Sequence, residues 1–123
     1  SEDNERLCSS DLPFAATYVP SGFASEPVEG PGGGATVPNA TVVHFEGPRG
    51  MFIDVFRGTN RYTIGTARQI TVLGSRAQIG AIEDGYAVDF TFGTPVFCNR
   101  FHVEGFGLVE QEVQRFAEGL TAG

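Results

Sequence analysis

The sequence contains no lysine and no tryptophan, and only two of its 123 residues are cysteine. All eight basic residues are arginine, against fifteen acidic ones, so the formal net charge is −7. A domain of this charge repels phosphate backbones, so we expect no nucleic-acid partner. No run of eighteen apolar residues exists to span a membrane. Because the chain begins with Ser rather than Met, we interpret it as a processed fragment, and a membrane tether would lie in a segment absent from it.

The composition is that of one globular domain covering residues 1–123. Apolar residues make up 41% of the chain and eleven are Phe, which is enough for a packed core. Seventeen Gly and seven Pro favour many turns over long helices. Residues 1–11 are polar and predict a loose N-terminal lead-in, and the Gly/Pro-rich residues 30–40 predict a flexible loop.

Alternating apolar residues predict β-strands along most of the chain. The expected strands are 23–28 at a sheet edge, 41–47, 51–58, 67–74, 76–84, 86–92 and 96–105. Turn sequences separate them, including Gly47–Gly50 and the hairpin signal Asp84–Gly85. From residue 41 on, short strands at intervals of about ten residues predict an antiparallel meander of about six strands.

The last segment changes its period and predicts an α-helix over residues 108–119. Its apolar stripe is formed by Val109, Val113, Phe116, Ala117 and Leu120. Glu110 and Glu112 fall in the first turn, where the helix dipole favours acids, and Gly119 is placed to end the helix. The predicted fold class is therefore α+β, a curved antiparallel sheet with a C-terminal helix packed on one face.

The cysteines, Cys8 and Cys98, predict a disulfide. Cys98 lies in a predicted strand four residues before His102, about 13 Å along it, which is too far for a nucleophile–base pair. Two buried free thiols and a reactive thiol remain the alternatives. A bond closing a loop of about ninety residues would stabilise the fold by roughly 4–5 kcal/mol. It would also imply an oxidising compartment, so we expect an extracytoplasmic location.

No motif in the sequence predicts catalysis. His44 and His102 are far apart and are interpreted as structural, and neither joins the cysteines in a metal-ligand spacing. The acids Asp54, Asp89, Glu83 and Asp84 form no carboxylate pair that can be placed on one site. The run at 30–34 lacks the Lys of a phosphate-binding loop, and Asn39 begins a sequon that is common by chance. We therefore expect no enzyme, no metal and no cofactor.

The segment 51–58 predicts a strand that is apolar on both faces. Met51, Ile53 and Val55 share one side, while Phe52 and Phe56 flank Asp54 on the other. One helix covers only one face of a sheet, so the second face needs another cover. Either residues 12–40 wrap over it, or Phe52, Asp54 and Phe56 form a binding surface.

Three stretches together resemble a family of bacterial extracytoplasmic domains of unknown function. They are Pro20–Phe23, Val72–Ile79 and Gly107–Leu120, in the order and with the short motifs typical of that family. The resemblance departs in two respects, the absence of Trp and the presence of the cysteine pair. Members occur in lipoproteins and in membrane-anchored regulators that resemble anti-sigma factors. The resemblance implies an exported domain with a binding or sensing role, and it carries over no catalytic residues.

The sequence leaves three functional hypotheses. The first is an exported, non-enzymatic domain that binds an unknown protein or a cell-envelope component, and it predicts a filled core and an exposed patch. The second is a carrier that holds an apolar, lipid-like ligand between sheet and helix, and it predicts an apolar cavity above about 300 Å³. The third is a small secreted hydrolase, and it predicts a cleft with clustered, perturbed titratable groups.

Overall fold

The computed structural model describes residues 12–26, 42–58 and 64–122. Nine strands and one α-helix are found there, with short 3₁₀ turns between them. The strands are β1 (Phe14–Ala16), β2 (Ala24–Glu26), β3 (Val42–Glu46), β4 (Phe52–Arg57), β5 (Ala67–Val72), β6 (Ser75–Ile82), β7 (Gly85–Thr91), β8 (Arg100–Phe106) and β9 (Leu120–Ala122). The helix is α2 (Glu110–Glu118), and the 3₁₀ turns are η2 (Pro48–Gly50) and η3 (Phe97–Asn99).

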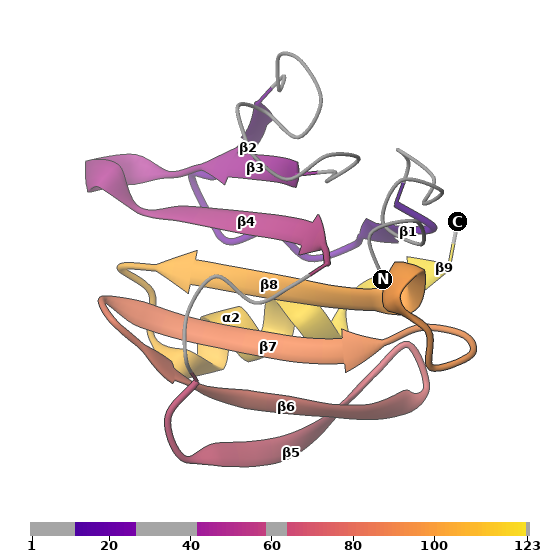
Figure 1. Ribbon diagram of the computed structural model, residues 1–123. Coiled ribbons are helices and arrows are strands. Elements are labelled where there is room, and N and C mark those ends of the chain that lie inside the picture. Colours follow the sequence, from indigo (N-terminus) through magenta and orange to yellow (C-terminus); the bar gives the residue numbers. More distant parts are fainter. Residues whose placement is uncertain (1–11, 27–41, 59–63, 123) are drawn as a thin grey trace.

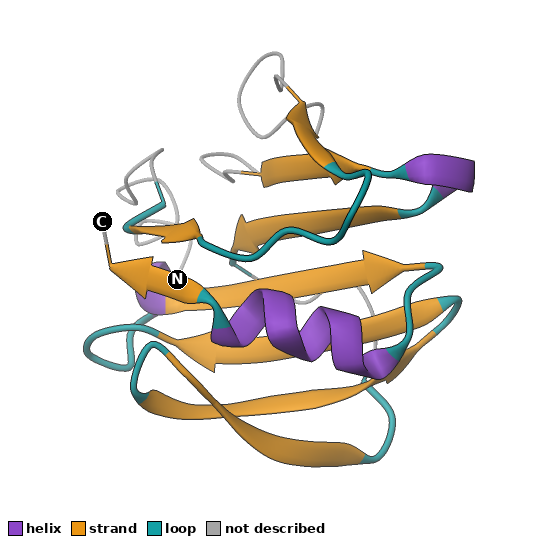
Figure 2. Ribbon diagram, turned by 180° about the vertical axis from the view of Figure 1, so that it is seen from behind, coloured by secondary structure: helices purple, strands orange, loops and turns teal. Residues whose placement is uncertain are grey.

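Seven strands form one antiparallel sheet in the order β2-β3-β4-β8-β7-β6-β5. Helix α2 crosses one face of this sheet, and β1 pairs with β9 in a small separate ribbon on the same side (Figures 1 and 2). The predicted α+β class, with a C-terminal helix on an antiparallel sheet, is confirmed. Strands β2, β3 and β4 are neighbours in sequence order, and so are β5, β6, β7 and β8. The two halves join where β4 pairs with β8, so after β4 the chain passes to β5 at the far edge of the sheet.

The core lies between the sheet and α2. Side chains alternate across the pleat, so one set of residues from each strand faces the helix. Val55, Val103 and Val88 lie side by side on β4, β8 and β7, and all are buried. At Gly105 the helix comes so close that an added Cβ would lie 2.6 Å from Val113 Cγ2. Glycine at this position therefore lets α2 pack directly on β8.

The helix stripe differs from the prediction at both ends. Val113, Phe116 and Ala117 are buried as predicted. Val109 is 64% exposed, because it precedes the helix with an extended backbone and its side chain leaves the stripe. Leu120 is buried, but it belongs to β9 and packs from there, since Gly119 ends the helix.

Cys98 lies in the 3₁₀ turn η3 and not, as predicted from the sequence, inside the strand. The turn forms because Asn99 N–H donates to the Val96 carbonyl, while the Asn99 side chain donates to the Thr94 carbonyl. No free cysteine occurs in the described part of the chain. Cys8, Asn39, the lead-in 1–11 and the loop 30–40 lie outside the described residues, so the Cys8–Cys98 bond stays a prediction.

Thiol titration tests that bond directly. We expect no free thiol when the protein is denatured without reductant, and two after reduction. Two thiols before reduction would contradict the pairing. Cys98→Ser should then lower the free energy of unfolding by about 2–5 kcal/mol, as removal of a native disulfide does in small exported domains.

Candidate functional site

The sheet face opposite α2 carries most of the buried polar side chains. On β8 the residues facing away from the helix are Arg100, His102, Glu104 and Phe106. His102 and Glu104 are buried, although β8 lies in the middle of the sheet. Buried charged groups need partners, so this face is where the fold concentrates its polar interactions.

Two rows of polar side chains run across β6, β7 and β8 on this face. In the first row Gln78 pairs with Asp89, and Asp89 pairs with His102. In the second, Thr91 pairs with Arg100, and the register that pairs Ala77 with Phe90 brings Arg76 beside Thr91. Thr91 therefore lies between two arginines, in strands about 4.8 Å apart.

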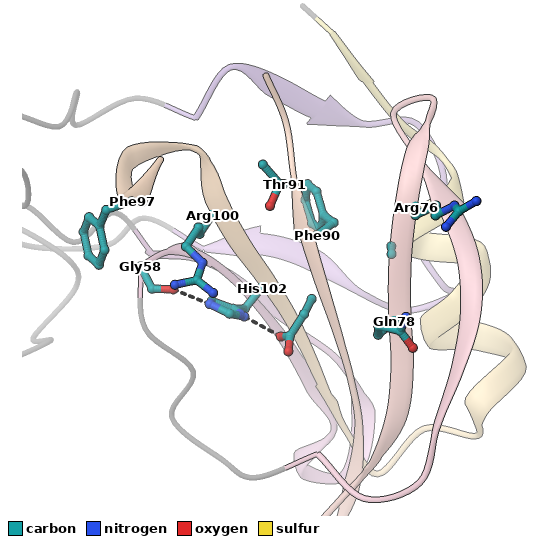
Figure 3. A pocket seen from close by; sticks show the side chains of 10 residues that line it. Gly58, Arg76, Gln78, Phe90, Thr91, Phe97, Arg100 and His102 are labelled. Atoms are coloured by element: carbon teal, nitrogen blue, oxygen red, sulfur yellow. Dashed lines mark hydrogen bonds and ion pairs between the residues drawn. The ribbon is translucent and has the colours of Figure 1, made fainter. Parts of the chain in front are cut away.

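These rows line a pocket of about 370 Å³, which we call the polar pocket. Gly58 at the end of β4 and Phe97 of η3 also line it. Figure 3 shows Arg100 and His102 on one side, Arg76 and Gln78 on the other, and Thr91 between them. The Arg76 side chain turns outward, so it needs a change of rotamer to reach a ligand, whereas Arg100 already lies beside His102. The arginines make this pocket locally cationic in an acidic protein.

His102 is fixed by contacts at both ring nitrogens. Nδ1 lies 2.5 Å from Asp89 Oδ1, and Nε2 contacts the Gly58 carbonyl oxygen. The Phe56 ring lies 5.1 Å from the imidazole, centroid to centroid. Both ring nitrogens therefore face acceptor atoms of the fold itself, and the contact with Asp89 holds that carboxylate in place.

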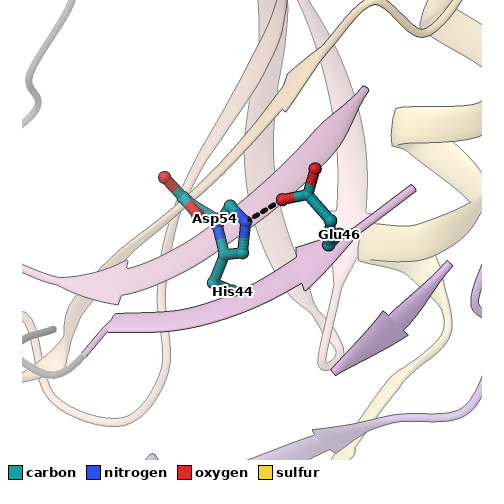
Figure 4. A network of polar contacts seen from close by, with 3 residues as sticks. All are labelled: His44, Glu46 and Asp54. Atoms are coloured by element: carbon teal, nitrogen blue, oxygen red, sulfur yellow. Dashed lines mark hydrogen bonds and ion pairs between the residues drawn. The ribbon is translucent and has the colours of Figure 1, made fainter. Parts of the chain in front are cut away.

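A second polar network lies on β3 and β4 (Figure 4). His44 Nδ1 is 2.5 Å from Asp54 Oδ1, and Nε2 is 2.7 Å from Glu46 Oε1. Burial lowers the pKa of His44, but the hydrogen bonds to Glu46 and Asp54 and their charges outweigh it, so the pKa is raised above 6.5.

The sign of this shift predicts a pH dependence. A raised histidine pKa stabilises the fold below the unfolded-state pKa, and that stability is lost as pH rises through the folded-state pKa. We expect the NMR titration of His44 to have its midpoint above 6.5, and Glu46→Gln to move the midpoint down. Glu118→Gln, on the exposed end of α2, is the control and should leave it unchanged. A Glu46→Gln midpoint equal to that of the parent protein would contradict the assignment.

Two acidic residues are cross-strand neighbours in the middle of this face. Asp54 of β4 lies directly opposite Glu104 of β8, and both are buried. This pair lies between the two histidine networks, because Glu104 is two residues from His102 on β8 while Asp54 contacts His44. Polar residues therefore occupy this face on every strand from β3 to β6. Among the described residues, no group of three or more His, Cys, Asp and Glu has the arrangement of a metal site.

The proposed surface of Phe52, Asp54 and Phe56 is only partly accessible. All three face away from α2, as predicted. Asp54 and Phe56 are 7% and 4% exposed, whereas Phe52 is half-buried and stacks on Phe106 with 4.5 Å between ring centroids. Phe52 is thus the member of this set that a partner can reach.

An apolar groove lies on the helix side, where β3 and β4 extend beyond α2. Its volume is about 420 Å³. It is lined by Leu12, Phe14, Ala15, Ala16, Val43, Phe45, Val55, Phe116 and Leu120. No helix in the described residues is long and apolar enough to cross a membrane. Of the large hydrophobic side chains in that part of the chain, only Val96 and Val109 are exposed.

Sequence reasoning missed Glu104, Arg76 and Arg100, and it did not bring either histidine together with its carboxylate. One signal was present, since each of these residues occupies the polar position of an alternating strand pattern. The alternating pattern predicts the face of the sheet on which a side chain lies, but not which strand is its neighbour. The contact partners of these residues follow only from the strand pairing in the structure.

Comparisons with protein-family models, with curated proteins and with solved structures found no match to this chain. The resemblance to the extracytoplasmic family stays a prediction.

Proposed function

We propose that the protein is an exported, non-enzymatic binding domain whose polar pocket takes an anionic component of the cell envelope. The observation that carries this proposal is the row Arg76, Thr91, Arg100 above the row Gln78, Asp89, His102. Guanidinium groups bind carboxylates through two parallel charged hydrogen bonds, and Thr91 adds a hydroxyl between them. The extracytoplasmic location rests on the predicted disulfide.

The second row favours a ligand that also carries hydroxyl groups. Asp89 accepts hydrogen bonds, and Gln78 both donates and accepts them, so together they suit the hydroxyls of a sugar ring. The Phe97 ring at the rim offers an apolar surface. An acidic sugar, such as the uronic acids of envelope glycans, has this combination of a carboxylate and neighbouring hydroxyls.

The histidines support binding rather than catalysis. Both nitrogens of His102 contact acceptors, and both nitrogens of His44 contact carboxylates. A general base needs one nitrogen directed at the substrate. The hydrolase hypothesis therefore gains nothing from either histidine.

Calorimetric titration with D-glucuronate, with D-glucose as the uncharged control, tests the proposal. We expect saturable binding of glucuronate that weakens with added salt, and little binding of glucose. Arg100→Gln should weaken glucuronate binding about tenfold or more, because it removes a charged hydrogen bond. Arg115→Gln makes the same charge change on α2, outside the lining of the pocket, and should have no such effect. Equal affinity for both sugars, or an Arg100 variant that binds normally, would overturn the proposal.

A second candidate is the carrier of an apolar ligand. The apolar groove supports it, because its volume of about 420 Å³ exceeds the roughly 300 Å³ at which ligand pockets begin. An acyl chain fits this lining, which consists of aliphatic and aromatic side chains. Saturable binding of a fluorescent fatty acid, blocked by Ala16→Phe but not by Arg100→Gln, would favour this candidate over the first.

A further inference from the structure

A third pocket lies at the end of the polar face where three turns meet. It is lined by Gly50, Phe52, Glu83, Asp84, Phe106 and Gly107 and has a volume of about 540 Å³. We call it the aromatic end pocket. It shares no lining residue with the polar pocket, so a ligand bound in it is independent of the proposed function.

The turns that form the aromatic end pocket are tightly connected. Gly107 N–H donates to the Asp84 carbonyl at 3.0 Å, which ties the end of β8 to the β6–β7 turn. Gly107 has φ +78°, and an added Cβ would lie 2.8 Å from Met51 Cγ next to the turn η2. This close approach needs glycine. The pocket is therefore bounded by backbone that other parts of the fold hold in place.

The lining combines aromatic rings with carboxylates. Phe52 and Phe106 are cross-strand neighbours whose rings stack at 28°. Glu83 and Asp84 are exposed in the adjoining turn, and Glu46 lies opposite Phe52 on β3. Phe52 also lies 5.3 Å from the His44 ring, so the two Phe rings supply an apolar contact for alkyl groups, and the nearby carboxylates supply the attraction for a positive charge. The exposed Arg49 of η2 opposes this attraction, and Glu46 is already bound by His44 Nε2 at 2.7 Å, so the attraction for a cation comes from Glu83 and Asp84.

We propose that the aromatic end pocket binds an organic ammonium group. The alkyl part of such a cation contacts Phe52 and Phe106, while its charge lies near Glu83 and Asp84. Both a free quaternary amine and the side chain of a basic partner carry this group. A metal ion lacks the apolar part, and a neutral ligand gains nothing from the carboxylates.

NMR titration with choline, with its uncharged isostere 3,3-dimethylbutan-1-ol and with Nα-acetyl-lysine amide tests the proposal. We expect choline to shift the amide signals of Gly50, Glu83 and Gly107 saturably, and the isostere to bind at least about tenfold more weakly. Tighter binding of the lysine amide than of choline would assign the group to a partner's side chain, and the reverse order would assign it to a free amine. Equal binding of choline and the isostere would overturn the proposal.

Two variants separate the charge from the rings. Glu83→Gln with Asp84→Asn keeps the turn, since Asn tolerates the positive φ of residue 84, and should weaken choline binding about tenfold. Glu110→Gln with Glu118→Gln removes the same charge from α2 and should leave binding unchanged. If both double variants weaken choline equally, the effect is one of net charge and the site is dropped. Both double variants should bind glucuronate with the affinity of the parent protein. A negative result with choline therefore does not affect the proposal for the polar pocket.

Discussion

Replacing Phe116 by Ala is expected to lower the free energy of unfolding by about 3–5 kcal/mol, the usual loss for a fully buried Phe. Phe116 is 0% exposed, and its ring meets Phe45 of β3 edge to face at 5.2 Å. The neighbours Val113 and Ala117 belong to the same short helix, and the sheet beneath them is hydrogen-bonded on both sides. Little relaxation is available to fill the cavity, so the loss should lie well inside this range.

Val109→Ala is the matched control. It also truncates an apolar side chain of the predicted helix stripe, but Val109 is largely exposed. Surface truncations of this kind usually change stability by less than about 0.5 kcal/mol. Urea denaturation of the two variants under identical conditions gives the comparison. Similar losses would mean that the helix packs through the stripe predicted from the sequence, including Val109, and not as the structure has it.

The local features of this fold could be predicted from the sequence, because they depend on residues close in the chain. Alternation in "YAVDFTF" places Val88 and Phe90 on one face and Asp89 on the other, and the structure agrees. The hairpin predicted at Asp84–Gly85 forms one residue earlier, with Glu83 and Asp84 in the turn and Gly85 already paired with Ile82, and it fixes the register of β6 against β7 in the same local way. The helix could be predicted for the same reason, since the 3.6-residue period of its apolar side chains is visible within nine consecutive residues.

The pairing of β4 with β8 could not be predicted in this way. These strands are separated by more than forty residues, and the alternating pattern of either strand does not indicate which strand it pairs with. Without this pairing, two features of the polar face could not be predicted either. Asp54 could not be placed opposite Glu104, and the ends of β4 and β8 could not be brought together at the aromatic end pocket.

The ends of elements were also less certain than their centres. The sequence "VFCNRF" alternates enough to resemble one strand, but the structure uses Phe97–Asn99 as a 3₁₀ turn. Asn99 favours the turn over a strand. Its side chain donates to the Thr94 carbonyl and its backbone N–H donates to the Val96 carbonyl, and these local hydrogen bonds compete with those of a strand ladder. The polar pocket depends on this turn, since it places Phe97 at the rim.

Phe52→Ser and Phe56→Ser are expected to differ strongly, although both residues lie on the same face of β4. Phe56 is 4% exposed and packs on the His102 ring, so its replacement should cost about 3–5 kcal/mol of unfolding free energy. Phe52 is half-buried, and its replacement should cost only about 1–2 kcal/mol, in proportion to the apolar area it covers. Denaturant unfolding measures both losses.

Choline titration of the same two variants separates a core role from a contact role. Phe52→Ser should abolish saturable choline binding while the protein stays folded, because it removes one ring of the aromatic end pocket. A folded Phe56→Ser protein should still bind choline, since Phe56 does not line that pocket. Equal stability losses would show that both rings belong to the core, and the role of Phe52 as a contact residue would then be abandoned. Unequal losses with unchanged choline binding would keep Phe52 at the surface but remove it from the cation site.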